Sequence, residues 1–271
     1  MATDIAATNA VPAEGRITTG RDGEIFLIGI DRPQKLNGFS LKMYRELGEA
    51  YTAMEKDATA RVGLVFAEGA HFTAGLQLDQ FAPLMQRGEA AVPAGGIDPL
   101  SLREPFRTKP VVCAVQGICF TLGIELMLAQ DIVVAADDCR FAQIEVKRGI
   151  MPTGGATMRF VERAGWGNAQ RYLLTGDEFN AAEAFRLGFV QEVVPAGQQF
   201  DRALAIARSI AEQAPLAVRA SLSSSRRYVE RGPVGIKPEM EAVQRQLAQS
   251  ADAAEGLKSF NERRKAKFTG R

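Results

Sequence analysis

The sequence of 271 residues contains one histidine, one tryptophan and three cysteines, and its 33 basic and 32 acidic side chains almost cancel. A single histidine and unclustered thiols leave too few soft ligands for a structural zinc site, so we expect no metal. A net charge of +1 creates no broad electrostatic field, so nucleic acids and anionic membranes are not expected as partners. The odd number of cysteines, without a Cys-x-x-Cys pair, favours a reducing compartment.

Long apolar runs are also missing. The longest uncharged apolar stretch, residues 110–124, is interrupted by Gln116 and Thr121 and is shorter than the roughly 20 residues that a membrane span needs. Residues 1–15 contain acidic but no basic side chains, and they lack the apolar run of a secretory signal. We therefore predict a soluble cytoplasmic protein with a flexible N-terminal tail over residues 1–15.

The hydrophobic pattern that is present predicts an α/β protein, because short apolar runs alternate with helical periods. A hairpin is expected over residues 17–30, followed by a helix with Ser40 as its N-cap that ends near residue 56. Glycine and proline make 88–99 the segment most typical of a flexible loop. The further short apolar runs predict buried strands at residues 62–66, 111–115, 132–136 and 141–144. A helix is expected at 122–130, and from residue 155 onward the pattern is almost entirely helical.

Two glutamates stand in apolar surroundings. Glu125 lies inside the apolar helical run, and Glu145 directly follows residues 141–144. Burial at either position would raise the pKa of the carboxyl group unless a donor stabilises its charge. One interpretation is structural: Glu125 faces solvent, and Glu145 pairs with Lys147 or Arg148. The other is a pair of carboxyl groups in one site that exchange protons near neutral pH.

Glycines interrupt the chain where two predicted strands end. Gly69 and Gly75 follow one strand, and Gly117 and Gly123 follow the other. Such loops expose backbone N–H groups, and two loops together offer two donors to one developing oxyanion; simple tight turns are the alternative. The chain has no Walker phosphate loop and no dinucleotide-binding fingerprint. No Gly-x-Ser-x-Gly elbow accompanies His71, so we do not expect this histidine to be catalytic.

Seven segments carry a further pattern, in a fixed order along the chain. They are IDRPQKLN (30–37), FTAGLQL (72–78), VQGICFTLGIEL (115–126), DI (131–132), FAQIE (141–145), GIMP (149–152) and FNERRKAKF (260–268). This ordered set resembles the crotonase family, and within it the enoyl-CoA hydratases, over residues 16–268. The resemblance implies a crotonase-like core, a spiral of ββα units, over residues 16–198. It also implies a C-terminal helical oligomerisation region over residues 199–271.

Carried over position by position, the resemblance puts the backbone N–H groups of Leu76 and Leu122 in an oxyanion hole that grips a thioester carbonyl. It places Glu125 and Glu145 at the two catalytic glutamate positions. Glu125 would be the base that orients water, and Glu145 the acid that delivers the α-proton. No cofactor is implied, because coenzyme A is part of the acyl-CoA substrate.

The resemblance also implies residues that bind the substrate. They are Lys35, Leu36, Ala74, Gln77, Leu78, Asp79, Phe260 and Arg263. Phe260 and Arg263 would reach coenzyme A bound largely by a neighbouring subunit, because the implied assembly is a homotrimer or a dimer of trimers. A solvated helix face is the alternative interpretation of the basic run around Arg263.

The sequence departs from the usual family pattern at both loops. The common Ala-Gly-Ala-Asp-Leu is replaced by Ala74-Gly75-Leu76-Gln77-Leu78, and Leu122 stands in a stretch that is usually rich in glycine. A backbone N–H works with any side chain, provided that the φ and ψ angles are accessible to a residue with a Cβ atom. The two leucines add bulk beside the thioester, so we expect a restricted acyl group.

The function implied by the resemblance is that of an enoyl-CoA hydratase in fatty-acid metabolism of the β-oxidation type. It adds water to a trans-2-enoyl-CoA and gives a 3-hydroxyacyl-CoA. Two alternatives remain open. One is an enoyl-CoA isomerase of the same family, which needs only Glu145. The other is a catalytically silent acyl-CoA-binding member whose oxyanion hole is spoiled by Leu76 and Leu122.

Overall fold

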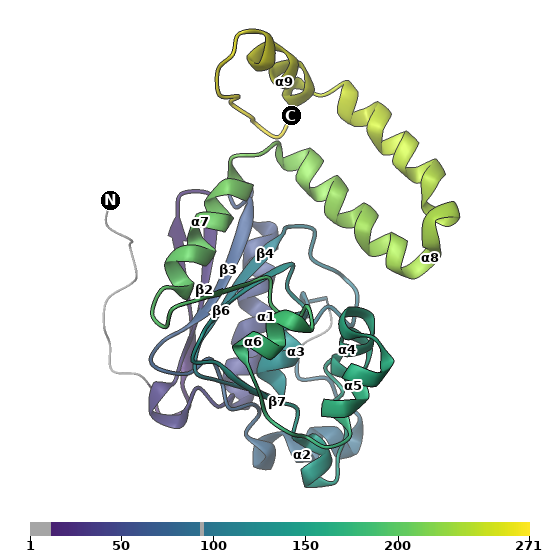
Figure 1. Ribbon diagram of the computed structural model, residues 1–271. Coiled ribbons are helices and arrows are strands. Elements are labelled where there is room, and N and C mark those ends of the chain that lie inside the picture. The colour runs from purple at the N-terminus through teal and green to yellow at the C-terminus, as the bar shows by residue number, and fades with distance from the viewer. Residues whose placement is uncertain (1–11, 93–94) are drawn as a thin grey trace.

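The computed structural model describes residues 12–92 and 95–271. Most of the predicted tail, residues 1–11, lies outside this described part, as do residues 93–94 of the predicted flexible loop. Figure 1 shows a compact α/β body from which the last helices project.

A six-stranded sheet forms the centre of this body, in the order β1-β2-β3-β4-β6-β9. The strands are β1 (Arg16–Asp22), β2 (Ile25–Asp31), β3 (Val62–Ala67), β4 (Val111–Val115), β6 (Ile132–Ala136) and β9 (Glu192–Val194). β1 and β2 form the predicted antiparallel hairpin, and β2 to β9 pair in parallel. The strands predicted at residues 62–66, 111–115 and 132–136 are confirmed.

Both faces of the large sheet are buried. Ile25 and Leu27 of β2 pack with residues of α7 (Gln199–Ala211), whereas Phe26 and Ile28 pack with residues of α1 (Leu41–Lys56) on the other face. Successive side chains of a strand point to opposite faces, so a strand covered on both sides is apolar throughout. The Ser40 hydroxyl accepts a hydrogen bond from Met43 N and caps α1 as predicted.

A second layer consists of short strands, two of which directly follow a strand of the large sheet. The three named strands of this layer are β5 (Ile118–Phe120), β7 (Arg140–Ala142) and β8 (Phe179–Asn180). The isolated bridges Phe39–Leu76 and Thr73–Cys119 extend the layer toward β2 and β3. β4, β5 and the helix α3 (Leu122–Leu128) make the clearest ββα unit. The ββα spiral implied by the resemblance is therefore confirmed.

Two short elements differ from their prediction. The strand expected at 141–144 is instead β7, which ends at Ala142, and the 3-10 helix η2 (Glu145–Arg148) follows. The apolar residue Ile144 is the N-cap of that helix, which explains why the apolar run overstated the strand. β5 was not predicted, because its three residues are too few to show a period.

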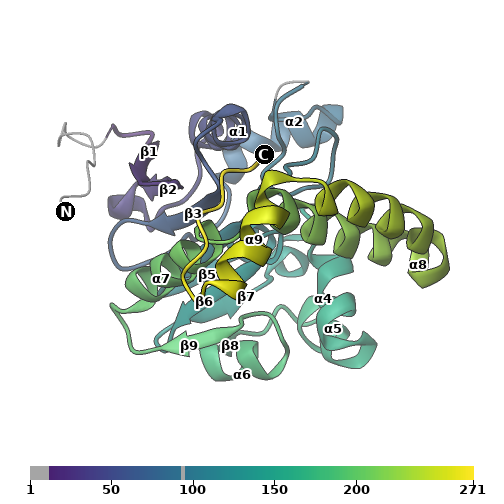
Figure 2. The same ribbon diagram turned by 90° about the horizontal axis from the view of Figure 1, so that it is seen from above.

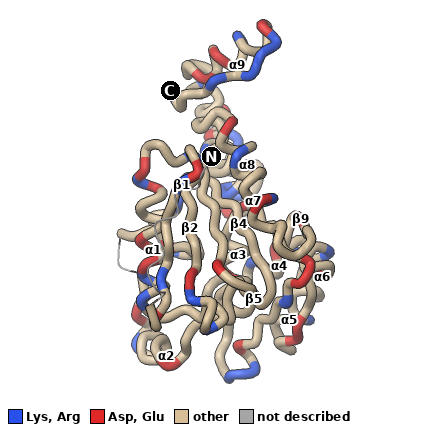
Figure 3. The backbone as a smooth tube through the Cα atoms, turned by 90° about the vertical axis from the view of Figure 1, so that its left-hand side faces the viewer, with Lys and Arg blue, Asp and Glu red and all other residues tan. Residues whose placement is uncertain are grey.

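The remaining helices complete the described part of the chain. They are η1 (Pro33–Lys35), α2 (Leu78–Arg87), α4 (Ala156–Ala164), α5 (Trp166–Leu173), α6 (Ala181–Arg186), α8 (Pro215–Ala248) and α9 (Ala251–Asn261). No helix in the described ranges combines the length and apolar character needed to cross a bilayer. Basic and acidic residues are interspersed along the backbone in Figure 3.

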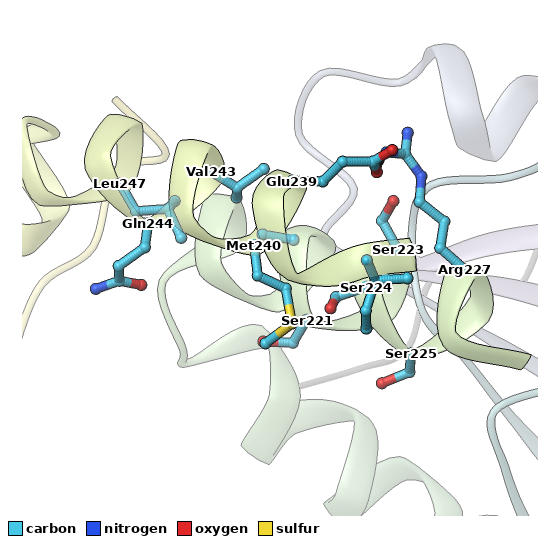
Figure 4. Close-up of a pocket in the computed structure, with 12 residues that line it drawn as sticks. Ser221, Ser223, Ser224, Ser225, Arg227, Glu239, Met240, Val243, Gln244 and Leu247 are labelled. Carbon is cyan, nitrogen blue, oxygen red and sulfur yellow. Dashed lines mark hydrogen bonds and ion pairs between the residues drawn. The ribbon is translucent and has the colours of Figure 1, made fainter. Parts of the chain in front are cut away.

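We call α8 and α9 the C-terminal arm, because they project from the body in Figures 1 and 2. The helical segment expected from residue 199 begins with α7, which packs on the large sheet; the projecting part begins at Pro215. α8 reverses direction at Gly232, where φ is 68°. A groove lies between its two legs, and Figure 4 shows the Met240 side chain of one leg reaching toward Ser221 of the other.

Candidate active site

Hydrogen bonds join the two loops that carry Leu76 and Leu122. Thr73 N donates to Ile118 O at 3.0 Å, and Phe120 N donates to Thr73 O at 3.0 Å. Beyond this bridge, Gly75 packs directly against Thr121, and a Cβ atom at Gly75 would collide with Thr121 Oγ1. The second layer therefore brings the peptide groups before Leu76 and Leu122 close together.

The N–H groups of both leucines are left without an acceptor. The bridge at Phe39 uses the neighbouring groups: Phe39 N donates to Gly75 O at 2.8 Å, and Gln77 N donates to Phe39 O at 2.9 Å. Leu122 is the first residue of α3, so its N–H precedes the intrahelical ladder. Neither N–H donates a hydrogen bond to any described residue.

Backbone strain falls beside the leucines and not on them. Neither Leu76 nor Leu122 has a positive φ, whereas φ is 103° at Gly75 and 47° at Thr121. A β-branched residue rarely adopts positive φ, and such outliers gather at sites where geometry matters. Both leucines therefore lie in backbone regions accessible to a residue with a Cβ atom. This is the requirement stated above for leucine N–H groups to form an oxyanion hole.

Glu125 is buried, with 5% of its surface exposed. Its Oε1 accepts hydrogen bonds from Gly154 N at 2.6 Å and Ala156 N at 3.3 Å, at the N-terminus of α4, where the helix dipole favours a negative charge. Burial and, to a smaller extent, the charge of Glu145 raise the pKa of Glu125 to about 7, although the two N–H donors and Arg159 lower it. The solvent-facing alternative for Glu125 is wrong.

Glu145 begins η2 and is only partly exposed. Its Oε1 accepts a hydrogen bond from Gln143 Nε2 at 2.9 Å, and its buried Oε2 has no partner among the described residues. Burial raises the pKa of Glu145 above its ordinary value. It pairs with neither basic neighbour that the structural interpretation named: Lys147 approaches Asp177, and Arg148 forms no ion pair with it.

The two glutamates and the two leucines line one cavity. This cavity has a volume of about 210 Å³ and includes Leu76, Leu122, Glu125 and Glu145 in its wall. A second cavity continues from it, because Leu76, Leu122 and Glu125 line that one too. The site therefore combines two carboxyl groups with shifted pKa and two unengaged backbone donors, a set of groups suited to proton transfer beside a developing oxyanion.

Only some of the residues expected to bind substrate lie at the first cavity. Ala74 and Leu78 line the first cavity. The loop with Lys35 and Leu36 adjoins it, because Ala74 N donates to Leu36 O at 3.0 Å.

Four further residues stand outside the cavity wall. Gln77 accepts a hydrogen bond from Arg32 Nη1 at 2.9 Å and lies 3.5 Å from Asp79. Phe260 and Arg263 are exposed, in α9 and just after it, and neither lines the cavity of their own chain. The structure therefore does not bring these two into the same site as the glutamates.

Three residues that matter to the site were missed by sequence reasoning. Gly154 provides an N–H for Glu125, and Gly155 caps α4 with φ of 106°. The adjacent glycines before a helical period are the signal that could have found them. Gln143, which holds Glu145, had no distinguishing signal in the sequence.

The remaining candidates for a nucleophile or a base, His71 and the three cysteines, have structural roles. His71 Nδ1 accepts a hydrogen bond from Ile118 N at 3.1 Å, so this side chain supports the bridge between the two loops. All three cysteines are free and buried. Burial raises the pKa of Cys113, Cys119 and Cys139, which keeps them as unreactive thiols.

Comparison with known proteins decides the family. A model of the enoyl-CoA hydratase/isomerase family matches residues 20–271. The chain belongs to this family. Enoyl-CoA hydratase/isomerase family members are enzymes, among them hydratases and dehydratases of acyl-CoA esters.

Curated and solved relatives extend over nearly the whole chain. The carnitinyl-CoA dehydratase of Proteus mirabilis is 33% identical over 255 residues, 92% of this chain and 96% of that protein. The enoyl-CoA hydratase EchA19 of Mycobacterium tuberculosis is 32% identical over 260 residues, 93% and 95% of the two chains. A probable enoyl-CoA hydratase/isomerase from Mycobacterium abscessus superposes with a TM-score of 0.91 at 45% identity, over 94% of this chain and 98% of that one.

Proposed function

We propose that this protein is an enoyl-CoA hydratase that adds water to a trans-2-enoyl-CoA and gives a 3-hydroxyacyl-CoA. The observation that supports the proposal most strongly is the cavity itself, where Glu125 and Glu145 accompany two backbone N–H groups that have no acceptor among the described residues. The comparisons support the family and its acyl-CoA chemistry. The reaction as we propose it uses protein groups only, with coenzyme A as part of the substrate.

In this reaction the N–H groups of Leu76 and Leu122 donate to the thioester oxygen. Removal of one such donor typically costs about 3 to 4 kcal/mol of transition-state stabilisation. As the water oxygen bonds to C3, the π electrons of the double bond move toward C2 and the thioester oxygen, giving an enolate. The two donors stabilise the charge that this enolate carries.

The two glutamates divide the proton transfers. Glu125, with Oε1 held by Gly154 N and Ala156 N, uses Oε2 to take a proton from the attacking water. A pKa of about 7 suits a base that works near neutral pH. Glu145, whose raised pKa favours the protonated form, gives its proton to C2. Proton exchange with solvent then restores both groups.

The test is to follow the loss of conjugated absorbance when crotonyl-CoA is added. Glu125→Gln and Glu145→Gln should each lower kcat by roughly 10²- to 10⁴-fold, the usual contribution of a positioned acid or base. Glu49→Gln, on the exposed side of α1, is the matched control and should retain full activity. Unchanged rates in both site variants would remove the assignment.

The same assay separates the two alternatives. An isomerase that uses Glu145 alone would tolerate Glu125→Gln, but the two N–H donors that hold Glu125 in the cavity favour hydration. A silent acyl-CoA-binding member would be stabilised by acyl-CoA esters without turning them over. The negative φ of both leucines speaks against a spoiled oxyanion hole.

We further propose that the chain assembles into a homotrimer or a dimer of trimers. The C-terminal arm supports this, because only Ile236, Asp252 and Ser259 are buried among residues 215–261. Light scattering should give three or six times the chain mass of 29.3 kDa, and a monomeric mass would contradict the proposal. A reducing cytoplasmic setting is consistent with the three free thiols.

A further inference from the structure

The second cavity extends the site beyond the two glutamates. It shares Leu76, Met85, Leu122, Glu125 and Thr153 with the first cavity but lacks Ala74, which adjoins the Leu36 loop expected to bind coenzyme A. Much of its remaining wall is apolar, with Phe81, Leu84, Leu100 and Leu102. An apolar wall on the far side of the thioester position suits the carbon chain of an acyl group.

The wall of this cavity also carries two polar groups with unused donors. The Arg103 side chain is 44% exposed and forms an ion pair with the buried Asp98, with Nε 3.8 Å from Asp98 Oδ2. This distance is too long for a hydrogen bond, so the N–H donors of Arg103 remain open to water or to a ligand. Tyr44 lines the same wall, and its hydroxyl donates to no described residue. Burial raises the pKa of Tyr44, and the charge of Asp98 raises it further, so this hydroxyl stays protonated.

The carboxylates of the same cavity are already engaged. Asp98 accepts from Leu100 N and from Leu102 N, each at 3.1 Å. Glu89 is held by two hydrogen bonds from Arg87, at 2.6 and 2.9 Å. Glu125 is held by the N-terminus of α4. The groups of this wall that remain open to a ligand are therefore the donors of Arg103 and Tyr44, which suit a ligand group that accepts.

We propose that the acyl chain of the substrate ends in a carboxylate, which Arg103 and Tyr44 bind. This inference rests on the acyl-CoA substrate proposed above and adds the chemical class of the acyl group. An arginine fork binds a carboxylate through two parallel hydrogen bonds, and the tyrosine hydroxyl adds a third donor. A chain of the same length that ends in a methyl group leaves these donors without an acceptor, so it should bind more weakly.

Binding tests the proposal directly. Saturated acyl-CoA esters are titrated calorimetrically in matched pairs of equal carbon number, one ending in a methyl group and the other in a carboxylate. The carboxylate ester should bind roughly 10- to 100-fold more tightly, as expected for hydrogen bonds to a charged group. Equal affinities in every pair would overturn the proposal, as would tighter binding of a trimethylammonium-ended ester.

Variants locate the effect. Arg103→Met should remove most of the carboxylate preference, and Tyr44→Phe should remove part of it. Arg45→Met is the matched control, because Arg45 is exposed on α1 next to Tyr44 and does not line the cavity; it should keep the full preference. If Arg103→Met fails to fold, Arg103→Gln replaces it. A preference that survives the loss of Arg103 would overturn the assignment of that residue.

Turnover separates this inference from the proposed function. Hydration of unsaturated esters of both kinds with equal kcat/KM and equal affinity would overturn the inference alone. A carboxylate preference in binding without hydration of either ester would overturn the proposed hydratase activity and uphold the ligand assignment.

Discussion

The region around Glu125 and the C-terminal arm are held in opposite ways. Glu125 is fixed by the start of α4, and the loops beside it are fixed to each other by backbone hydrogen bonds. The arm has little interior of its own, with Val234, Leu257 and Phe260 exposed by 88%, 66% and 80%. A site that must place donors to within a fraction of an ångström needs several segments packed together. The arm instead presents apolar surface that another copy of the chain is expected to cover.

Apart from the substitutions of the two glutamates, the largest effect should come from Gly75→Ala. The new Cβ atom meets Thr121 Oγ1, and the φ of 103° disfavours any side chain, so the Leu76 N–H should move out of position. We expect kcat for crotonyl-CoA to fall roughly 100- to 1,000-fold, the cost of one lost oxyanion donor.

The matched control for this variant is Gly23→Ala in the turn between β1 and β2. It has a φ of 58° with no atom within 4 Å of the added Cβ, so it introduces backbone strain without touching the site. It should lose stability by about 1 kcal/mol and keep its kcat. Equal losses of activity in both variants would mean that strain, and not the oxyanion hole, explains the effect.

The next effect concerns the stability of the region around Glu125. Its pKa is about 7 in the folded protein against an ordinary 4.5, so the folded form binds the proton more tightly than the unfolded chain. Its contribution to the free energy of unfolding is therefore complete below about pH 4.5 and is lost as the pH rises through 7, on the order of 3 kcal/mol. Glu125→Gln should abolish this loss in urea unfolding measured across the pH range. If the free energy of unfolding of Glu125→Gln depends on pH in the same way as that of the wild type, the raised pKa of Glu125 is contradicted.

A smaller effect should follow from loosening the arm. Arg226 of α8 donates to Arg107 O at 2.5 Å and approaches Asp131 Oδ1 at 3.5 Å. Arg107 remains paired with Asp131 without it, so Arg226→Met should cost about 1 to 2 kcal/mol in docking of the arm. Hydrogen exchange should rise in α8 and not in β4. Faster exchange in both elements would show that arm and body unfold together.

The smallest effect on the stability of the body should come from a substitution on the exposed face of α8. Val229 is 65% exposed, so Val229→Asp should change the free energy of unfolding of the dissociated chain by less than about 0.5 kcal/mol. If a second copy covers this face, the same change should lower the mass measured by light scattering. Gln246→Asp, also exposed on α8, adds the same charge at a polar position and serves as the control. Retention of the assembly in Val229→Asp would place the interface elsewhere.

Local pattern was sufficient for much of the fold. The strands β3, β4 and β6 can be recognised as apolar runs because both faces of the large sheet are buried. Ser40 indicates the start of α1 because its hydroxyl accepts a hydrogen bond from a backbone N–H group that has no partner within the helix. β5 was not predicted, because its three residues are too few to show a hydrophobic period and form a strand only by pairing with β7.

The sequence by itself determined the order of the elements, the family resemblance and the two glutamates worth testing, because these depend on residue type and spacing along the chain. Only the tertiary structure decided that Glu125 is buried against Gly154 N, that the leucine N–H groups lack acceptors, and that Arg103 and Tyr44 share a wall with them. The physical reason is that pKa, hydrogen-bond satisfaction and cavity shape depend on groups far apart in sequence, whose distances are set when the layers pack.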